Sequence, residues 1–225
     1  MARSRSAKLR KAHKIHFNTN FNTTVASKAR FSSSCNDIHL NCRLQCMRCK
    51  AETVTGERCS RTTCLSLPFC WQHLKYFTHL KILPTTLFKN NTPVAGLGLF
   101  ADDASANPNP VFKPGDIITS YIGQRRSQEE TDKDYGDCVA PYALKTSSNV
   151  VIDAACLRSV AAFANDIRND NTCSGKCLIN AQLYSNGNFY PVMKATKDIY
   201  HGDEIFVNYG EEYWNGVEIT HKTRR

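Results

Sequence analysis

Four residues of the types that bind metal ions stand close together in the first third of the sequence. Cys49 and Cys59 flank Gly56, which suits the turn between them, and Cys70 and His73 follow. Because Cys70 and His73 are three residues apart at the start of an expected helix, their side chains face the same way. Three thiolates and one imidazole suit tetrahedral Zn²⁺, and with all four positions filled such a site is structural.

The number and distribution of cysteines also favour a metal site. The chain has 11 cysteines, and seven of them fall within residues 35–70. The opening residues lack the apolar core of a secretory signal, so a disulfide framework is disfavoured. Cys42, Cys46 and Cys64 are left over, which leaves a second or exchanged ligand set open. The alternative is a group of reduced thiols without a metal.

Tyr209, near the C-terminus, could do a different kind of chemistry. A turn at residues 200–203 leads into a segment in which Ile205, Val207 and Tyr209 occupy alternate positions. Aromatic and β-branched residues on both faces indicate a short strand that is buried on both sides. Such a strand places a phenol beside Gly210. That phenol is either a core tyrosine with a satisfied hydroxyl or a group that contacts a substrate.

The elements that must position these residues are short. Strands are expected over residues 116–123, 139–144, 150–153 and 188–196, helices over 71–82 and 127–135, and a buried segment over 159–164. Since no long helix is expected, the pattern predicts a mainly β domain with short helices and not a wound α/β fold. With 41% hydrophobic residues, the chain can bury a real core.

Positive charge is concentrated at the N-terminus. Residues 1–34 hold eight of the 29 Lys and Arg residues and no Asp or Glu, so the remainder has 21 basic against 20 acidic residues. Such a tail favours nucleic-acid contact or a localisation signal. An organelle transit peptide and a solvated disordered leader have a similar composition. No apolar run approaches the length of a membrane span, so we expect an intracellular protein without a membrane partner.

The order of several short motifs makes a family visible. The motifs are Gly96-x-Gly98, Tyr121-x-Gly123, Tyr142-x-Leu144, Ile152-Asp153-Ala154, Phe163-Ala164-Asn165, Asn180-Ala181, Pro191-Val192 and the run from Gly202 to Gly210. In this order they resemble the SET domain of protein-lysine methyltransferases over residues 94–214. The resemblance implies several small sheets, with the Asn165 segment threaded under the C-terminal strand as a pseudoknot. It also implies S-adenosylmethionine on one side and a lysine entering a narrow channel from the other.

The resemblance assigns a role to individual positions. It implies contacts with the cofactor at Gly96, Leu97, Gly98, Asn165 and Asp166, with Trp214 covering the adenine. It implies that Tyr209 is the catalytic tyrosine of the channel and Tyr121 a second one near the methyl group. Asn165-Asp166-Ile167-Arg168 stands where the family usually has Asn-His-Ser-Cys.

A second resemblance concerns the cysteine-rich stretch. Residues 49–73 are similar to a short Cys/His motif that recurs in proteins of large DNA viruses and some protists. Together the two resemblances suggest a domain order. We expect a basic disordered tail (1–34), a zinc module (35–83), a SET-like methyltransferase domain (94–214) and a basic C-terminal tail (215–225).

Two functions from different classes follow from these observations. The first is methyl transfer from S-adenosylmethionine to a protein lysine, on a histone or another basic protein, in the nucleus or cytoplasm, of a host cell if the source is a virus. The second is a catalytically inactive SET-like scaffold whose zinc module and basic tail bind nucleic acid or protein. The methyl-transfer function is favoured because the chain retains Tyr209, Tyr121, Asn165 and both glycines of Gly96-x-Gly98.

Val207 bears on the number of methyl groups transferred. Many family members place Phe or Tyr at this position, and there the bulk of the side chain limits how many methyl groups the amine accepts. A small Val leaves room for the amine to turn, so we expect a di- or trimethylated product unless Tyr184 or another tyrosine fills the space from the neighbouring strand.

Overall fold

The computed structural model describes residues 47–63, 67–86, 88–89, 92–93, 96–136, 140–147, 149–167, 179–185, 190–211 and 213. Both expected basic tails and Trp214 therefore lie outside the described residues, as do Cys42, Cys46 and Cys64. Among the residues that are described, no helix is long and apolar enough to cross a lipid bilayer.

Helix α4 (Gln128–Tyr135) forms where the sequence predicts it. Ser127 is its N-cap and accepts a hydrogen bond from the backbone N–H of Glu130, while the Glu130 carboxylate accepts one from Ser127 N. This reciprocal capping box satisfies two backbone donors that the first turn leaves without partners. The buried segment expected over 159–164 contains a 3₁₀ turn, η3 (Val160–Phe163). A second 3₁₀ turn, η2 (Ala104–Ala106), lies on the surface.

Helix α3 (Trp71–Thr78) is shorter than expected. It ends where His79 adopts the left-handed conformation, with φ 54°, and donates its N–H to the carbonyl of Lys75. The next residue, Leu80, is fully buried and begins strand β1 (Leu80–Pro84) opposite Ala101. The prediction of a helix to Ile82 is therefore wrong. Pairing with a distant strand overrides the helical spacing of the apolar residues.

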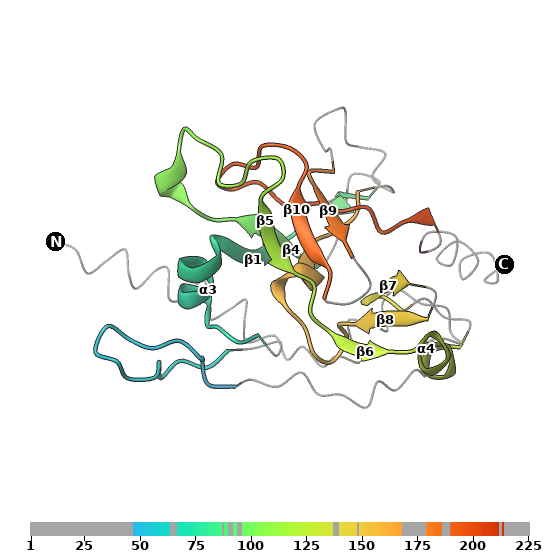
Figure 1. The fold of residues 1–225 in the computed structure, drawn as a ribbon. Coiled ribbons are helices and arrows are strands. Elements are labelled where there is room, and N and C mark those ends of the chain that lie inside the picture. The colour runs from blue at the N-terminus through green and yellow to red at the C-terminus, as the bar shows by residue number, and fades with distance from the viewer. Residues whose placement is uncertain are drawn as a thin grey trace.

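The strands within the described residues form four small sheets. Besides β1 they are β2 (Phe88–Lys89), β3 (Thr92–Pro93), β4 (Leu97–Ala101), β5 (Ile117–Ser120), β6 (Gln124–Arg126), β7 (Ala143–Ser147), β8 (Val150–Asp153), β9 (Ala181–Tyr184) and β10 (Val192–Ala195). Their orders are β1-β4, β2-β3, β5-β10-β9 and β6-β8-β7, and the neighbouring strands are antiparallel. Figure 1 shows β5 and β10 side by side and β6, β7 and β8 grouped next to α4. The mainly β fold with short helices is confirmed.

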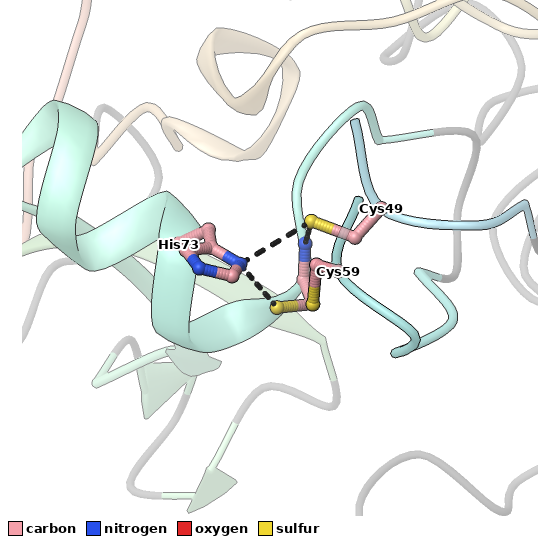
Figure 2. Close-up of side chains that lie close together, drawn as sticks. Cys49, Cys59 and His73 are labelled. Carbon is pink, nitrogen blue, oxygen red and sulfur yellow. Dashed lines mark hydrogen bonds between the residues drawn. The ribbon is translucent and has the colours of Figure 1, made fainter. Parts of the chain in front are cut away.

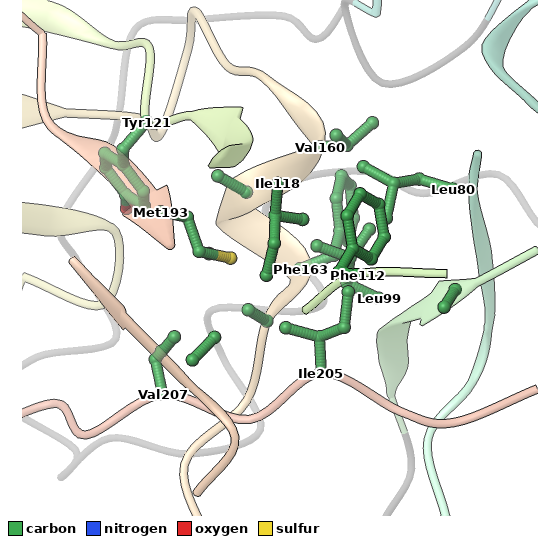
Figure 3. Packing of buried hydrophobic residues seen from close by; sticks show 14 of the residues in the cluster. Leu80, Leu99, Phe112, Ile118, Tyr121, Val160, Phe163, Met193, Ile205 and Val207 are labelled. Atoms are coloured by element: carbon green, nitrogen blue, oxygen red, sulfur yellow. The ribbon is translucent and has the colours of Figure 1, made fainter. Parts of the chain in front are cut away.

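The core connects these sheets. Leu99 of β4, Met193 of β10 and Ile205 have no exposed surface, and they pack in one cluster with Ile118 of β5 and Val160 of η3. Figure 3 shows these side chains converging from different elements. Burial of an aliphatic side chain of this size stabilises a fold by roughly 1.5–3 kcal/mol. The elements that hold the candidate site are thus fixed by one shared core.

The C-terminal segment passes between two earlier segments. Val207 N donates to the carbonyl of Asn165 at 2.9 Å, in a parallel bridge between Asn165 and Phe206. On the other side, the carbonyl of Phe206 accepts from Asn180 N and Ala181 N. This threading is the pseudoknot that the sequence led us to expect.

The same segment corrects one expectation. Residues 204–207 are all buried, as predicted for a strand covered on both faces. In the described residues they form isolated bridges, Phe100 with Glu204 and Asn165 with Phe206, and are not part of a named strand. The reason is that the C-terminal segment changes its bridge partner from β4 to the Asn165 segment within three residues.

Candidate active site and metal centre

A cavity of about 600 Å³ lies between α4, η3 and the C-terminal segment. Five tyrosines are among the residues that line it: Tyr121, Tyr135, Tyr142, Tyr209 and Tyr213. Small and apolar side chains, including those of Ala161, Ala164 and Val207, form one part of its walls, and charged residues such as Asp132 and Lys145 form another. Tyr121, Val207 and Tyr209 were singled out in the sequence, whereas the places of Tyr135, Tyr142 and Tyr213 in the cavity were not.

The hydroxyls of the two predicted catalytic tyrosines are bound to backbone carbonyls. Tyr209 donates to the carbonyl of Ala164 at 2.8 Å, and Tyr121 donates to that of Tyr142 at 2.8 Å. A phenol has a single hydrogen, so each oxygen can offer only lone pairs to a further partner. Burial is the main cause that raises the pKa of both phenols, with Tyr213 adding to the rise for Tyr209 and Asp153 for Tyr121. Both groups are therefore neutral at physiological pH.

The wall formed by α4 is tied to the sheet below it by a buried carboxylate. Asp153, only 4% exposed, accepts from the Tyr135 hydroxyl at 3.0 Å and from Arg126 at 3.3 Å. Arg126 also pairs with Asp134 of the helix. Burial, followed by the charge of Asp153, raises the pKa of the Tyr135 phenol. This network keeps Tyr135 directed into the cavity.

Val207 and Tyr184 occupy different places relative to the cavity. Val207 lines the cavity and is 2% exposed, so its small side chain forms part of the cavity wall. Tyr184 is 45% exposed and is not among the lining residues. Its hydroxyl donates to Gln182, and the Lys194 ammonium lies 5.3 Å from its ring centroid.

The segments predicted to hold the cofactor lie together. The side-chain amide of Asn165 donates to the carbonyl of Leu97 at 3.0 Å and to the Glu204 carboxylate at 3.1 Å. A Cβ on Gly98 would lie 2.0 Å from a carboxylate oxygen of Glu204. The sequence suggested that Gly98 allows close approach to a ligand. In the structure it allows close approach of Glu204.

Glu204 is a residue that sequence reasoning missed. Its carboxylate is buried, and it accepts from the Thr85 hydroxyl, from Thr86 N and from the Thr86 hydroxyl at 2.6–2.7 Å, in addition to Asn165. Four donors offset the cost of burying the charge. Its role could have been inferred from its place directly before the apolar run Ile205-Phe206-Val207. A carboxylate at such a position is expected to be buried, and a buried carboxylate needs hydrogen-bond donors.

Asp166 is placed against the backbone of Tyr209. Its carboxylate is 6% exposed and accepts a hydrogen bond from Tyr209 N at 2.6 Å. Two of the residues on which the sequence analysis focused are thereby in direct contact.

The four predicted metal ligands converge in the N-terminal region. The ligand atoms of Cys49, Cys59, Cys70 and His73 all lie within 4.8 Å of one another. Tetrahedral Zn²⁺ with thiolate ligands holds its sulfur atoms roughly 3.8 Å apart, so the set fits this ion. Figure 2 shows the imidazole of His73 facing the sulfur atoms of the cysteines. The Nδ1 atom lies 3.5 Å from Cys49 Sγ and 3.3 Å from Cys70 Sγ.

A hairpin and a helix start deliver these ligands. Cys59 N donates to the carbonyl of Ala51 and Cys49 N to that of Arg61, and the turn between the strands uses Gly56 at φ 78°. Cys70 is the N-cap of α3, and its N–H donates to Cys49 Sγ at 3.2 Å. Burial raises the pKa of both the Cys49 and the Cys70 thiol, but for Cys49 the hydrogen bonds from Cys70, Ala51 and Cys59 outweigh it and lower the pKa overall.

Two arginines brace the hairpin in a way that the sequence did not reveal. Arg48 Nε donates to the carbonyl of Cys59, and Arg58 Nε donates to the carbonyl of Cys49, both at 3.0 Å. Each guanidinium thus fixes the backbone of a predicted metal ligand on the opposite arm of the hairpin.

Comparison with known proteins agrees with this geometry. Residues 96–210, just over half of the chain, match the SET domain. The protein therefore belongs to the SET-domain family, whose members are generally protein-lysine methyltransferases. None of the curated proteins matches the chain at a significant level.

Several solved structures are similar in fold. The ctPRC2 complex in an autoinhibited conformation bound to S-adenosylmethionine has a TM-score of 0.44 at 20% identity, over 66% of this chain and 17% of that chain. Chaetomium thermophilum Polycomb Repressive Complex 2 bound to GSK126 has 0.44 at 20% identity, over 64% and 17%. An active polycomb repressive complex 2 in the basal state has 0.41 at 20% identity, over 59% and 15%. The protein thus spans less than a fifth of the length of the chains it resembles.

Proposed function

We propose that this protein transfers methyl groups from S-adenosylmethionine to a lysine side chain of another protein, a histone or another basic protein. The observation that carries the proposal is the cavity in which Tyr121, Val207 and Tyr209 meet, although Tyr121 is far from the other two in the sequence. The lysine would enter this cavity, and the two phenols would orient its amine. A SET-like scaffold without activity would have no need of this arrangement.

The chemistry requires a neutral amine with a directed lone pair. A lysine has an ordinary pKa of about 10.4, and apolar walls such as those at Ala161, Ala164 and Val207 disfavour its charged form. Since the hydroxyls of Tyr121 and Tyr209 already donate to carbonyls, they can only accept N–H bonds from the amine. The lone pair of the amine then remains available for attack, and no charged residue is needed to hold it.

The cofactor would be held by the segment around Gly96, Leu97 and Gly98 together with the side chain of Asn165 and the backbone of Asp166. The hydrogen bond from Asn165 to Leu97 keeps these two segments adjacent, which supports a shared role. When bound, S-adenosylmethionine supplies a methyl group on a sulfonium. Alignment of two reactants can lower the barrier of such a displacement by roughly 7–11 kcal/mol, so positioning accounts for most of the expected acceleration.

Activity is tested by a radiolabelled transfer assay. Purified protein, labelled S-adenosylmethionine and either core histones or whole-cell lysate are incubated, and label on protein is measured before and after acid hydrolysis. Label recovered as methylated lysine supports the proposal. Absence of label on every protein, at concentrations where the cofactor binds, would favour the inactive scaffold.

Replacement of Asn165 with Ala is expected to weaken binding of S-adenosylmethionine by about tenfold or more. The variant loses the amide that joins the Leu97 carbonyl to Glu204, and one or two such hydrogen bonds are worth about 1–3 kcal/mol. Calorimetric titration measures the affinity. Asn149→Ala, which removes an exposed asparagine, is the matched control. Equal affinities of the wild type and Asn165→Ala would show that Asn165 does not organise the cofactor site.

The product is expected to carry two or three methyl groups. Val207 is small and lines the cavity, and Tyr184 does not reach it, so neither of these two side chains would stop the amine from turning between transfers. Mass spectrometry after exhaustive reaction identifies the product. Val207→Phe should shift the product towards monomethyl-lysine. Monomethyl-lysine alone from the wild-type protein would contradict this expectation.

The N-terminal region would bring the enzyme to its target and would not take part in the methyl transfer. We assign residues 35–83 to a module built on one structural Zn²⁺ and residues 94–214 to the catalytic domain. The ligands Cys49, Cys59, Cys70 and His73 leave no position open for a reactant, which is why a structural role is proposed. The basic tail of residues 1–34 would add contact with nucleic acid.

A further inference from the structure

The short segment of residues 164–166 contacts Tyr209 both at its side-chain hydroxyl and at its backbone N–H. The hydroxyl donates to the carbonyl of Ala164 at 2.8 Å, and the backbone N–H donates to the Asp166 carboxylate at 2.6 Å. Between these two contacts, the carbonyl of Asn165 accepts from Val207 N. Three successive residues therefore anchor the stretch that carries the tyrosine.

Asp166 supplies the anchor closest to the Cα of Tyr209. The parallel bridge between Asn165 and Phe206 lies three residues before Tyr209. At Gly210 the chain turns with φ 87°. A charge-assisted hydrogen bond to Tyr209 N, made by a carboxylate that is 6% exposed, anchors the backbone at this point. The direction of the Cα–Cβ bond of Tyr209, and so the path of its ring, depends on this contact.

We propose that Asp166 is a positioning residue for methyl transfer, which acts through the backbone of Tyr209. This inference rests on the proposed function of the same site. The carboxylate fixes the start of the Tyr209 side chain, and the carbonyl of Ala164 fixes its end. The phenol oxygen is then held where its lone pairs face the cavity. A loose backbone at Tyr209 would leave the fold and the cofactor site intact but spread the positions of this oxygen.

The test separates placement of the acceptor from its charge. Asp166→Asn keeps an acceptor oxygen in the same place and loses the charge, so kcat should stay within about twofold of wild type. Asp166→Glu keeps the charge but moves it by one methylene, and Asp166→Ala removes the acceptor, so both should lower kcat about fivefold or more. Affinity for S-adenosylmethionine should be unchanged in all three, because only the backbone of Asp166 is proposed to contact the cofactor. Asp116→Ala is the matched control, since the exposed Asp116 also accepts a backbone N–H, from Lys113 at 2.8 Å.

A double-mutant cycle with Tyr209→Phe shows whether the two residues act together. If Asp166 works through the Tyr209 hydroxyl, Asp166→Glu should have little further effect on kcat once that hydroxyl is gone. An equal loss in both backgrounds would overturn the proposal and assign Asp166 a general structural role. So would wild-type kcat in Asp166→Glu, or a loss confined to cofactor affinity. If Asp166→Ala does not fold, the Asn and Glu variants decide.

The outcomes also distinguish this inference from the function on which it rests. A wild-type protein that labels no lysine rejects the proposed function and with it any positioning role. A wild-type protein that labels lysine, but whose Asp166 and Tyr209 variants lose activity independently, rejects the positioning role alone.

Discussion

Replacing Tyr209 with Phe is expected to lower the rate of lysine methylation by about tenfold or more while the protein remains folded, since loss of one positioned polar group commonly costs a few kcal/mol of transition-state stabilisation. The phenyl ring keeps the packing against Tyr213, whose ring centroid lies 4.9 Å away. What is lost is the hydroxyl that donates to Ala164 and offers its lone pairs to the amine. The measurement is kcat with saturating cofactor and a histone or lysate substrate.

A matched control separates the role of this hydroxyl from a general effect of removing a phenol. Tyr76 is 76% exposed on α3, so Tyr76→Phe should leave turnover unchanged. Thermal unfolding of both variants reports whether the core is intact. Wild-type turnover in Tyr209→Phe would reject a catalytic role and return Tyr209 to the simpler interpretation of a core tyrosine with a satisfied hydroxyl.

Replacing Cys59 with Ser is expected to reduce bound zinc from one equivalent to near zero and to unfold the hairpin of residues 47–63. The reason is the composition of the small core at this end of the protein. The buried residues packed together here are Cys49, Ala51, Cys59 and Cys70, so three of the four are proposed ligands. Without a metal, little apolar surface remains to offset the conformational entropy of ordering the hairpin, and metal binding becomes part of the folding free energy.

Metal analysis of the purified protein and limited proteolysis test this expectation. Cleavage within residues 47–63 should increase in Cys59→Ser and in wild-type protein treated with a chelator. Ser60→Ala, at the exposed neighbouring position, should bind zinc normally. Wild-type protein without zinc, or a Cys59→Ser variant that is as soluble and protease-resistant as wild type, would leave the thiols as unligated cysteines.

Some features could be predicted because their determinants lie close together in the sequence. The capping box of Ser127 and Glu130 starts α4, and Gly56 permits the turn of the hairpin. The spacing of Cys70 and His73 places both side chains on one side of a helix start. In each case the interacting groups are within a few residues, so local backbone preferences are enough.

The cavity was foreseen only in part. Tyr209 and Tyr121 were assigned from the order of motifs, but Tyr142 and Tyr213 carry no local pattern that marks them as lining residues. Helix α3 was extended too far for the same reason, because the pairing of Leu80 with Ala101 joins positions 21 residues apart. A pattern with a period of three or four residues cannot report such a partner.

The sequence by itself determined the mainly β class, the short elements, the candidate metal ligands and the identity of the residues that could do chemistry. Only the tertiary structure decided how the acidic groups are used. Glu204 binds a threonine hydroxyl 119 residues away, and Asp166 binds the backbone of Tyr209, 43 residues away. A buried carboxylate must find donors, and which donors it finds depends on which segments the core brings together. Here the donors are determined by the threading of the C-terminal segment past Asn165. The threading places both carboxylates beside segments that are distant in the sequence, so local sequence patterns could not predict these contacts.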